Sequence, residues 1–413
     1  MSEWVTDSLS QLVSVQKGRK VQTSDYELPG YVPYLGAGAI SGKNDGYAST
    51  AQAVVANFND VLMLWDGERS GLVGRGLNGV VSSTVTKLTP NVKIDSKLLY
   101  YLLLFNFEWI QNRRTGTGVP HVPKDLGRIL QLCYPLEHES QRRIARILQT
   151  IDQAIEKTEA LVKKYQHIKA GLMHDLFTRG VGADGQLRPP REQVPELYQH
   201  TPVGWIPKEW DTTTLRTACL EISDGAHYSV SRCDEGVPFL FVSCVRNGQI
   251  LWDNAARISP ETYEEISKKS KPYKGMILFT VVGSYGHVAY VPTDDPFGFE
   301  RNIAYIKPRV DILEPKFLAY WLSSNCVENQ VERLVIGNAQ KVLTLGNMGK
   351  VVIPFLKQKE QKSIVTILES IDVILGCEQK RLDKFADQKS GLMHDLLTGK
   401  VQVNAKVSEV DHD

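Results

Sequence analysis

The chain carries one long stretch twice, and this repeat constrains the fold more than any other feature. Residues 141–181 align with residues 361–401 without an insertion. Each residue of the first copy corresponds to the residue 220 positions later, so residue 141 corresponds to residue 361. The sequence Gly-Leu-Met-His-Asp-Leu at 171–176 recurs unchanged at 391–396. An internal repeat of this length decides the architecture, so it has to be interpreted before any local motif. The fold must therefore hold two equivalent elements.

Both copies have the residue spacing of a coiled-coil helix. Apolar residues follow one another at intervals of four and three through each copy, and no proline interrupts either one. A seam of this kind, sustained over several heptads, is typical of helices that pair. At about 1.5 Å per residue, some 38 residues would form a rod of roughly 57 Å. We expect the pairing contacts to include Leu148, Ile151, Ile155, Leu172, Leu368, Ile371, Leu375 and Leu392.

Two polar seam positions also match between the copies. Thr158 corresponds to Glu378, and Lys169 corresponds to Lys389. Polar residues in a seam can fix the register of a helix pair. The alternative is that the copies are two ordinary amphipathic helices on separate cores, but their equal length and equal seam chemistry favour pairing with each other.

Around the two helices, the sequence indicates two domains of mixed α/β character, and hence the α+β class. Short apolar runs at 32–35, 53–55 and 61–65 are typical of buried strands, and residues 96–109 are typical of an apolar helix. The runs 237–240, 276–279 and 316–320 repeat this plan. The expected division is 1–136, first domain; 137–180, first helix; 181–207, a Pro- and Gly-rich extended linker; 208–353, second domain; 354–400, second helix; and 401–413, a polar tail.

Composition narrows the class of protein. The net charge of +1 does not indicate a protein that coats nucleic acid non-specifically. Six cysteines form no CxxC pair, so we expect reduced thiols in the cytoplasm, with no disulfide framework and no zinc site. The N-terminus lacks the basic and apolar regions of a signal peptide. The longest apolar run, 98–105, is too short to cross a bilayer, so no membrane association is expected.

The sequence lacks the motifs that would indicate catalysis. It contains no GxxxxGK[ST] phosphate loop, no HExxH, and no Asn-Pro-Pro-Phe or Asp-Pro-Pro-Tyr tetrad for methyl transfer to a base. The acidic residues Asp294, Asp295 and Glu300 have no Glu-x-Lys after them, so solvated turns explain them better than a nuclease site. We therefore expect neither catalytic nor metal-binding residues. Two alternatives stay open, namely a single-chain nuclease or modification enzyme with an unrecognised site, and a coiled-coil scaffold that reads no DNA.

The loops between the expected strands are rich in side chains that can recognise bases. Arg, Asn and Gln can bond a base edge at two points, and neighbouring glycines let a loop approach a backbone closely. Taken singly, each of these residues is as consistent with an ordinary exposed loop, and only their clustering indicates a reading surface. We expect contact with double-stranded DNA from Arg69, Arg75, Arg113, Arg114 and His121 in the first domain, and from Arg246, Asn247, Tyr285, His287, Arg301, Asn302, Asn338, Gln340 and Lys341 in the second.

Together these features resemble the specificity subunit of a type I restriction–modification system, over nearly the whole chain. The resemblance rests on the two Gly-Leu-Met-His-Asp-Leu copies, on the entry to the second domain at 201–210, and on the stretches 115–123 and 337–343 that precede the helices. It implies two target-recognition domains joined by antiparallel helices. Each domain would read one half of a split DNA sequence, and the helices would hold the halves a fixed distance apart.

The resemblance also implies partners that carry the chemistry. Two methyltransferase subunits would dock symmetrically, and restriction/translocase subunits would join them unless the system methylates without cutting. S-adenosylmethionine and ATP would belong to these partners, so no cofactor and no catalytic residue is expected on this chain. A rod of roughly 57 Å exceeds one DNA turn of about 34 Å, so it could place two domains in successive major grooves. Unlike loops imply unlike half-sites, so the target should be asymmetric.

Overall fold

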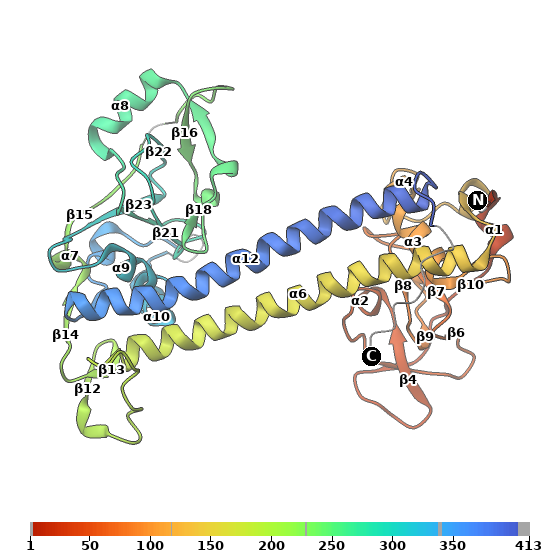
Figure 1. Ribbon diagram of the computed structural model, residues 1–413, viewed down its shortest axis with the longest axis horizontal. Coiled ribbons are helices and arrows are strands. Elements are labelled where there is room, and N and C mark those ends of the chain that lie inside the picture. The colour runs from red at the N-terminus through yellow and green to blue at the C-terminus, as the bar shows by residue number, and fades with distance from the viewer. Residues whose placement is uncertain (1–2, 117, 228, 338–340, 404–413) are drawn as a thin grey trace. The chain divides into compact units, whose positions relative to one another are not determined.

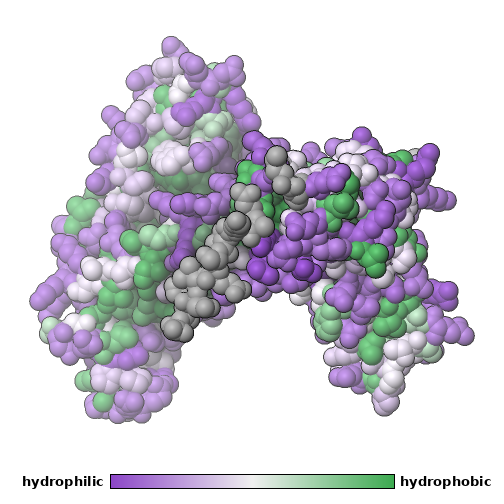
Figure 2. Space-filling model, turned by 45° about the vertical axis from the view of Figure 1, so that its right-hand side comes forward, coloured by the Kyte–Doolittle hydropathy of each residue, from purple (hydrophilic) through white to green (hydrophobic). Residues whose placement is uncertain are grey.

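The computed structural model describes residues 3–116, 118–227, 229–337 and 341–403. The chain forms two compact units: unit 1 comprises residues 1–161 and 378–413, and unit 2 comprises residues 162–377. The elements of both are labelled in Figure 1. On the face drawn in Figure 2, the surface of each unit is largely hydrophilic, with hydrophobic side chains in small groups.

The domain in unit 1 is built from short strands that pair in antiparallel fashion, except for the parallel pair β4–β9. Its strands are β1 (Trp4–Ser8), β2 (Val13–Lys17), β3 (Thr23–Ser24), β4 (Tyr31–Leu35), β5 (Tyr47–Ser49), β6 (Val55–Ala56), β7 (Val61–Leu64), β8 (Val73–Arg75), β9 (Gly79–Val81), β10 (Val85–Pro90) and β11 (Gln131–Pro135). One sheet has the order β2-β10-β7-β8, and a second has the order β3-β5-β4-β9-β6. The first and last strands, β1 and β11, pair with Trp4 opposite Pro135. This pairing brings the start of the domain next to the start of the helix that follows it.

The helices of unit 1 complete its core. They are α1 (Leu9–Leu12), α2 (Ala37–Ile40), α3 (Ser96–Phe105), α4 (Phe107–Gln111), α5 (Leu126–Ile129) and the first part of α6 (His138–Thr178). Asp95 caps α3 by accepting hydrogen bonds from the amides of Lys97 and Leu98. The sequence predicted one helix over 96–109, which is wrong, because the chain breaks at Asn106. The backbone of Asn106 leaves the helical conformation, and its side-chain amide donates to the carbonyl of Leu102 at 2.8 Å, next to the bond from its backbone amide.

The domain in unit 2 repeats the sheet of unit 1. Its strands are β12 (Tyr198–Thr201), β13 (Gly204–Pro207), β14 (Asp211–Thr214), β15 (Cys219–Asp224), β16 (Val237–Leu240), β17 (Val245–Arg246), β18 (Gln249–Ile250), β19 (Ala256–Ile258), β20 (Ile277–Thr280), β21 (Val288–Tyr290), β22 (Gly298–Phe299), β23 (Ile303–Pro308) and β24 (Val352–Phe355). The sheet order β15-β23-β20-β21 corresponds to β2-β10-β7-β8, and the pair β14–β24 corresponds to β1–β11. The predicted α+β class, with one plan used twice, is confirmed.

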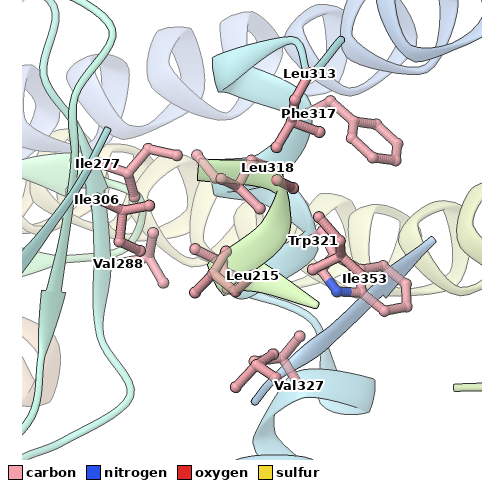
Figure 3. Close-up of a cluster of buried hydrophobic side chains, with 14 of the residues drawn as sticks. Leu215, Ile277, Val288, Ile306, Leu313, Phe317, Leu318, Trp321, Val327 and Ile353 are labelled. Carbon is pink, nitrogen blue, oxygen red and sulfur yellow. The ribbon is translucent and has the colours of Figure 1, made fainter. Parts of the chain in front are cut away.

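The helices of unit 2 complete its core. They are α7 (Leu215–Ala218), α8 (Pro260–Ser270), α9 (Pro315–Leu322), α10 (Asn325–Leu334), α11 (Leu345–Met348), the first part of α12 (Gln358–Leu397), and the 3-10 turns η1 (Pro195–Leu197), η2 (Val242–Cys244) and η3 (Trp252–Asn254). Figure 3 shows side chains from the sheet and from α9 pointing toward one another, among them Ile277, Ile306 and Leu318. Phe317 and Trp321 on α9 are fully buried in the same cluster. The core thus sits between the sheet and the long helices.

The stretch 181–207 differs from the extended linker that its prolines and glycines predicted. Residues 198–207 form the β12–β13 hairpin, in which Thr201 lies opposite Gly204. Ile206 on this hairpin is 1 % exposed and belongs to the core of unit 2. Proline and glycine marked the turns correctly, but the packing of the segment depends on residues far away in the sequence.

Helices α6 and α12 are each continuous, with 41 and 40 residues, and they pair in antiparallel fashion. In unit 1, Lys389 of α12 forms an ion pair with Asp152 of α6 at 2.7 Å. In unit 2, Lys169 of α6 forms an ion pair with Asp372 of α12 at 2.5 Å. The predicted pairing of two long helices is therefore confirmed.

The predicted pairing residues fall into two groups. Four of them lie in hydrophobic clusters that contain both helices and the adjoining domain: Leu148 and Leu392 in unit 1, and Leu172 and Leu368 in unit 2. The other four, Ile151, Ile155, Ile371 and Leu375, lie nearer the middle of the helices and are half-buried. The ends of the helix pair thus belong to the domain cores, so each domain is packed on both helices.

A buried glutamine near the start of each helix holds the helix on its own domain. Gln361 is 0 % exposed, accepts a hydrogen bond from the amide of Glu314 at 2.7 Å, and donates to the carbonyls of Ile312 and Leu356 at 2.9 and 2.8 Å. The repeat equivalent, Gln141, accepts a hydrogen bond from the amide of Asp95 and donates to the carbonyls of Lys93 and Pro135.

Replacing Gln361 by methionine should lower the free energy of unfolding by about 2 kcal/mol, because a buried amide and two carbonyls lose their partners. Chemical denaturation of the purified protein measures this change. Gln388→Met, at an exposed position of the same helix, is the matched control and should be neutral. A Gln361→Met protein as stable as the control would show that the glutamine is not an anchor.

Candidate nucleic-acid interface

In unit 1, two loops that carry predicted DNA-contacting residues are joined by backbone hydrogen bonds. The loop after β7 contains Asp66, and the second loop runs from Thr115 to His121. The amide of Gly67 donates to the carbonyl of Pro120 at 2.8 Å, and Thr115 and His121 bond each other in both directions. The two loops therefore form one surface at the edge of the domain.

Asp66 organises the charges on this surface. Its carboxylate binds Lys17 at 3.0 Å through one oxygen and the Nδ1 of His121 at 2.7 Å through the other. Lys17 and His121 are half-exposed, whereas Asp66 is only 18 % exposed. The carboxylate thus holds two cationic or hydrogen-bonding groups in fixed positions while they still face solvent.

The predicted arginines of unit 1 divide into inward and outward groups. Arg114 is inward, because its guanidinium donates to the carbonyls of Gln111 and Glu68. Arg75 lies over the ring of Tyr100 at 5.4 Å. Arg113 is exposed and lies over the ring of Trp109 at 3.9 Å. Arg69 is exposed, and its guanidinium has no hydrogen bond or ion pair to any residue that the structure describes.

Unit 2 uses the same loop arrangement with different residues. Val282 and Ile336 both bridge to Val342, as Asp66 and Thr115 bridge to His121 in unit 1. Apolar side chains therefore replace the Asp66–His121 pair. The two surfaces have one geometry and different chemistry.

In unit 2, the carboxylate that binds the neighbouring polar side chains is that of Glu332, which lies on α10. Lys341 binds one oxygen of Glu332 at 2.8 Å, and the hydroxyl of Tyr285 donates to the other. Both hydrogen bonds lower the pKa of Glu332 below its ordinary value, and the bond from Lys341 has the larger effect. The hydrogen bond to Glu332 likewise raises the pKa of Lys341, so the lysine stays charged at neutral pH.

Of the remaining predicted residues in unit 2, Arg246 and Asn302 are held by hydrogen bonds within the unit, and His287 is half-buried. Arg246 donates to the carbonyls of Val242 and Val245, both at 2.7 Å. Asn302 donates to Glu300 at 3.2 Å. Partial burial is the main cause that lowers the pKa of His287, and the charge of Arg246 lowers it further. The ring is therefore uncharged at neutral pH.

Arg301 and Asn247 face solvent. Arg301 lines a surface pocket of about 360 Å³ together with Asp224 and Asn302. Asn247 occupies the turn between β17 and β18 with a φ of 53°, a conformation that asparagine tolerates better than most residues. The predicted residues Asn338 and Gln340 lie outside the described part of the chain.

A basic run next to the loops of unit 1 was not predicted from the sequence. Lys17 ends β2, Arg19 and Lys20 follow it, and all three are exposed. Gly18 follows Lys17, and a Cβ at this position would lie 2.1 Å from the carbonyl oxygen of Ser82, so the run lies close against the loop between β9 and β10. Three positive charges within four residues were the signal that could have identified it.

The described residues contain no group of three or more His, Cys, Asp and Glu side chains placed to hold a metal ion. Among these residues, no helix is both long and apolar enough to cross a membrane.

The family model for the type I restriction–modification DNA specificity domain matches residues 1–163 and 211–384, so it matches twice. The chain is 27 % identical over 413 residues to the type I restriction enzyme MjaVIII specificity subunit of Methanocaldococcus jannaschii, covering 97 % of this chain and 93 % of that protein. It is 26 % identical over 346 residues to the EcoBI specificity subunit of Escherichia coli, covering 82 % and 72 %.

Solved structures share the fold. The crystal structure of a type I restriction–modification S subunit from M. genitalium matches with a TM-score of 0.62 at 17 % identity, covering 96 % of each chain. A structure described as the basis of complex assembly and conformational transition of the type I system matches with a TM-score of 0.52 at 17 % identity, covering 96 % of this chain and 98 % of the other.

Proposed function

The chain belongs to the type I restriction–modification DNA specificity family, and we propose that each of its two units reads one half of a split DNA target. The observation that carries the proposal is the double match to the family model, with one match in each domain. In both domains the loop after an inner strand of the sheet, β7 or β20, is joined to the same second loop, and the loops carry exposed polar side chains. Such side chains are the ones that recognise base edges in the major groove.

The two half-sites should differ in sequence. The surface of unit 1 presents Lys17, His121 and Arg69, whereas the surface of unit 2 presents Tyr285, Lys341 and Arg301. Base identity is read by the donors and acceptors that a loop offers, so unlike sets select unlike bases. The complete target is therefore an asymmetric sequence in two parts.

The chain acts as the recognition subunit, and partners supply the chemistry. Its relatives are named as specificity subunits of restriction enzymes. The repeated helices offer two equivalent docking faces, which suits two methyltransferase subunits, with restriction/translocase subunits as further partners. S-adenosylmethionine and ATP would bind to these partners, and the complex would work in the cytoplasm, where its DNA lies. The chain itself would neither methylate nor cut.

Selection from a random DNA library tests this function. The complex with the type I methyltransferase subunits of the same genome should enrich two unequal half-sites at a constant gap. The isolated chain, with its net charge of +1, should bind the same DNA weakly, because the partners supply most phosphate contacts. Enrichment of one continuous site, or tight salt-resistant binding by the isolated chain, would refute the assignment.

A further inference from the structure

An aspartate at the same repeat position of each long helix joins three elements. Asp152 of α6 accepts a hydrogen bond from the hydroxyl of Tyr101 on α3 at 2.7 Å, and its other oxygen binds Lys389 of α12 at 2.7 Å. In unit 2, Asp372 of α12 accepts from the hydroxyl of Tyr320 on α9 at 2.6 Å, and its other oxygen binds Lys169 of α6 at 2.5 Å. We call each Asp–Tyr–Lys set a clasp.

The clasps are partly buried, so their pairing matters more than that of a surface ion pair. The lysine and aspartate side chains are 24–25 % and 30–33 % exposed, and Tyr101 is fully buried. Burial is the main cause that raises the pKa of Tyr101 and of Tyr320, and the hydrogen bond to the aspartate raises it further. Both hydroxyls therefore stay protonated and act as donors. A partner lost from such a site leaves a charge with poor access to water.

Both clasps form at the same register of the helix pair. Asp152 and Lys169 are 17 residues apart on α6, and Asp372 and Lys389 are 17 residues apart on α12. A slip of one heptad would place Leu382 or Leu396 opposite Asp152, and Val162 or Leu176 opposite Asp372. The apolar seam repeats every heptad and tolerates such a slip better, whereas both clasps would be lost together.

The other polar seam positions make no such connection. The hydroxyl of Thr158 donates to the carbonyl of Ala154 in its own helix, at 2.8 Å. Glu378 lies 3.8 Å from Arg381, which is also in its own helix. Of the two pairs of polar positions that the repeat offered, only the lysine pair links one helix to the other.

We propose that the two clasps fix the register of the helix pair and thereby set the length of the gap between the half-sites. The proposal rests on the proposed function, since a gap exists only for a split target. A heptad slip moves one helix along the other by about 10 Å, which corresponds to about three base pairs at 3.4 Å each. The tyrosines extend the same constraint to the domains, because α3 and α9 pack against the sheets that carry the reading loops. These residues are positioning residues that need not touch DNA.

Methylation of a DNA series tests the proposal. The complex with its methyltransferase subunits is given targets whose half-sites are constant and whose gap is lengthened or shortened by one to three base pairs. The measured quantity is the rate of methylation on an altered gap divided by the rate on the native gap. In the double variant Lys169→Met with Lys389→Met, this ratio should be at least tenfold higher than in the wild type. Both half-site sequences should stay the same, which a general loss of structure would not produce.

Lys164→Met with Lys384→Met is the matched control, because these two lysines are also repeat equivalents and are exposed. It should keep the wild-type gap preference, and arginine at 169 and 389 should restore it. Thermal unfolding checks that each variant is folded, and the single lysine variants replace the double variant if it is not. An unchanged gap preference in the folded lysine variants overturns the role of the clasps, whereas a wild-type complex without any split target overturns the proposed function as well.

Discussion

Replacing Arg69 by alanine should reduce methylation of the native target by about tenfold to a hundredfold, and Arg301→Ala should have an effect of similar size. Each arginine is exposed at the reading surface of one unit, and Arg69 has no partner among the described residues that would hold it away from a ligand. A specific contact between arginine and a base is worth about 1–3 kcal/mol, which sets the size of the loss.

The two variants should differ in where specificity is lost. Arg69→Ala should relax recognition within one half-site, and Arg301→Ala should relax it within the other. Arg128→Ala is the control in unit 1, because this arginine of α5 is 81 % exposed, pairs with Asp125, and is not among the residues expected to contact DNA. Sequencing of methylated sites from a degenerate target library measures all three. An equal loss on every sequence, with a weaker salt dependence, would instead mean that the arginines contact phosphates.

Replacing Arg188 by methionine should lower the free energy of unfolding by about 3–5 kcal/mol, since it leaves Glu360 buried without its counter-ion. The two side chains are 12 % and 13 % exposed and lie 2.5 Å apart. Glu360 also accepts hydrogen bonds from the amide of Val181 and the indole of Trp210. Burial alone would lower the pKa of Arg188, but its hydrogen bonds to Glu360 and Glu209 raise it. The pair therefore fastens the segment after α6 to the start of α12 within unit 2.

A double variant separates the ion pair from simple packing. Adding Glu360→Gln to Arg188→Met should recover part of the lost stability, because removing both charges costs less than leaving one unpaired. Arg191→Met, in the same segment but more exposed, is the control and should cost less than 1 kcal/mol. Denaturant titrations measure each value. A single Arg188→Met variant within 1 kcal/mol of wild type would contradict the role given to this pair.

Periodicity predicted the long helices because it is a local property. The four–three spacing from Ile144 to Leu176 is visible in the sequence and does not depend on what the helix contacts. The break at Asn106 was missed, because apolar residues continue on both sides of it and the bonds from Asn106 to Leu102 are visible only in the structure. The β12–β13 hairpin was missed because Ile206 and Arg188 gain their partners from α12 and the core, far along the chain.

Residue type predicted the kind of surface but not which way each side chain points. Arg69 and Arg114 lie beside similar glycine-rich loops, yet Arg114 bonds two carbonyls inside the domain and Arg69 is exposed. Lys17 was overlooked because its position beside Asp66 depends on a contact 49 residues apart. The clasps show the same limit: the matching lysines were visible as a repeat, but their aspartate and tyrosine partners required the fold.

A genome-wide map of methylated bases, made with and without this chain in cells that hold its methyltransferase partner, tests the central claim most directly. A two-headed reader predicts one asymmetric motif of two unequal half-sites at a constant gap, methylated only when the chain is present. A motif without a gap, or methylation that is unchanged when the chain is removed, would contradict it.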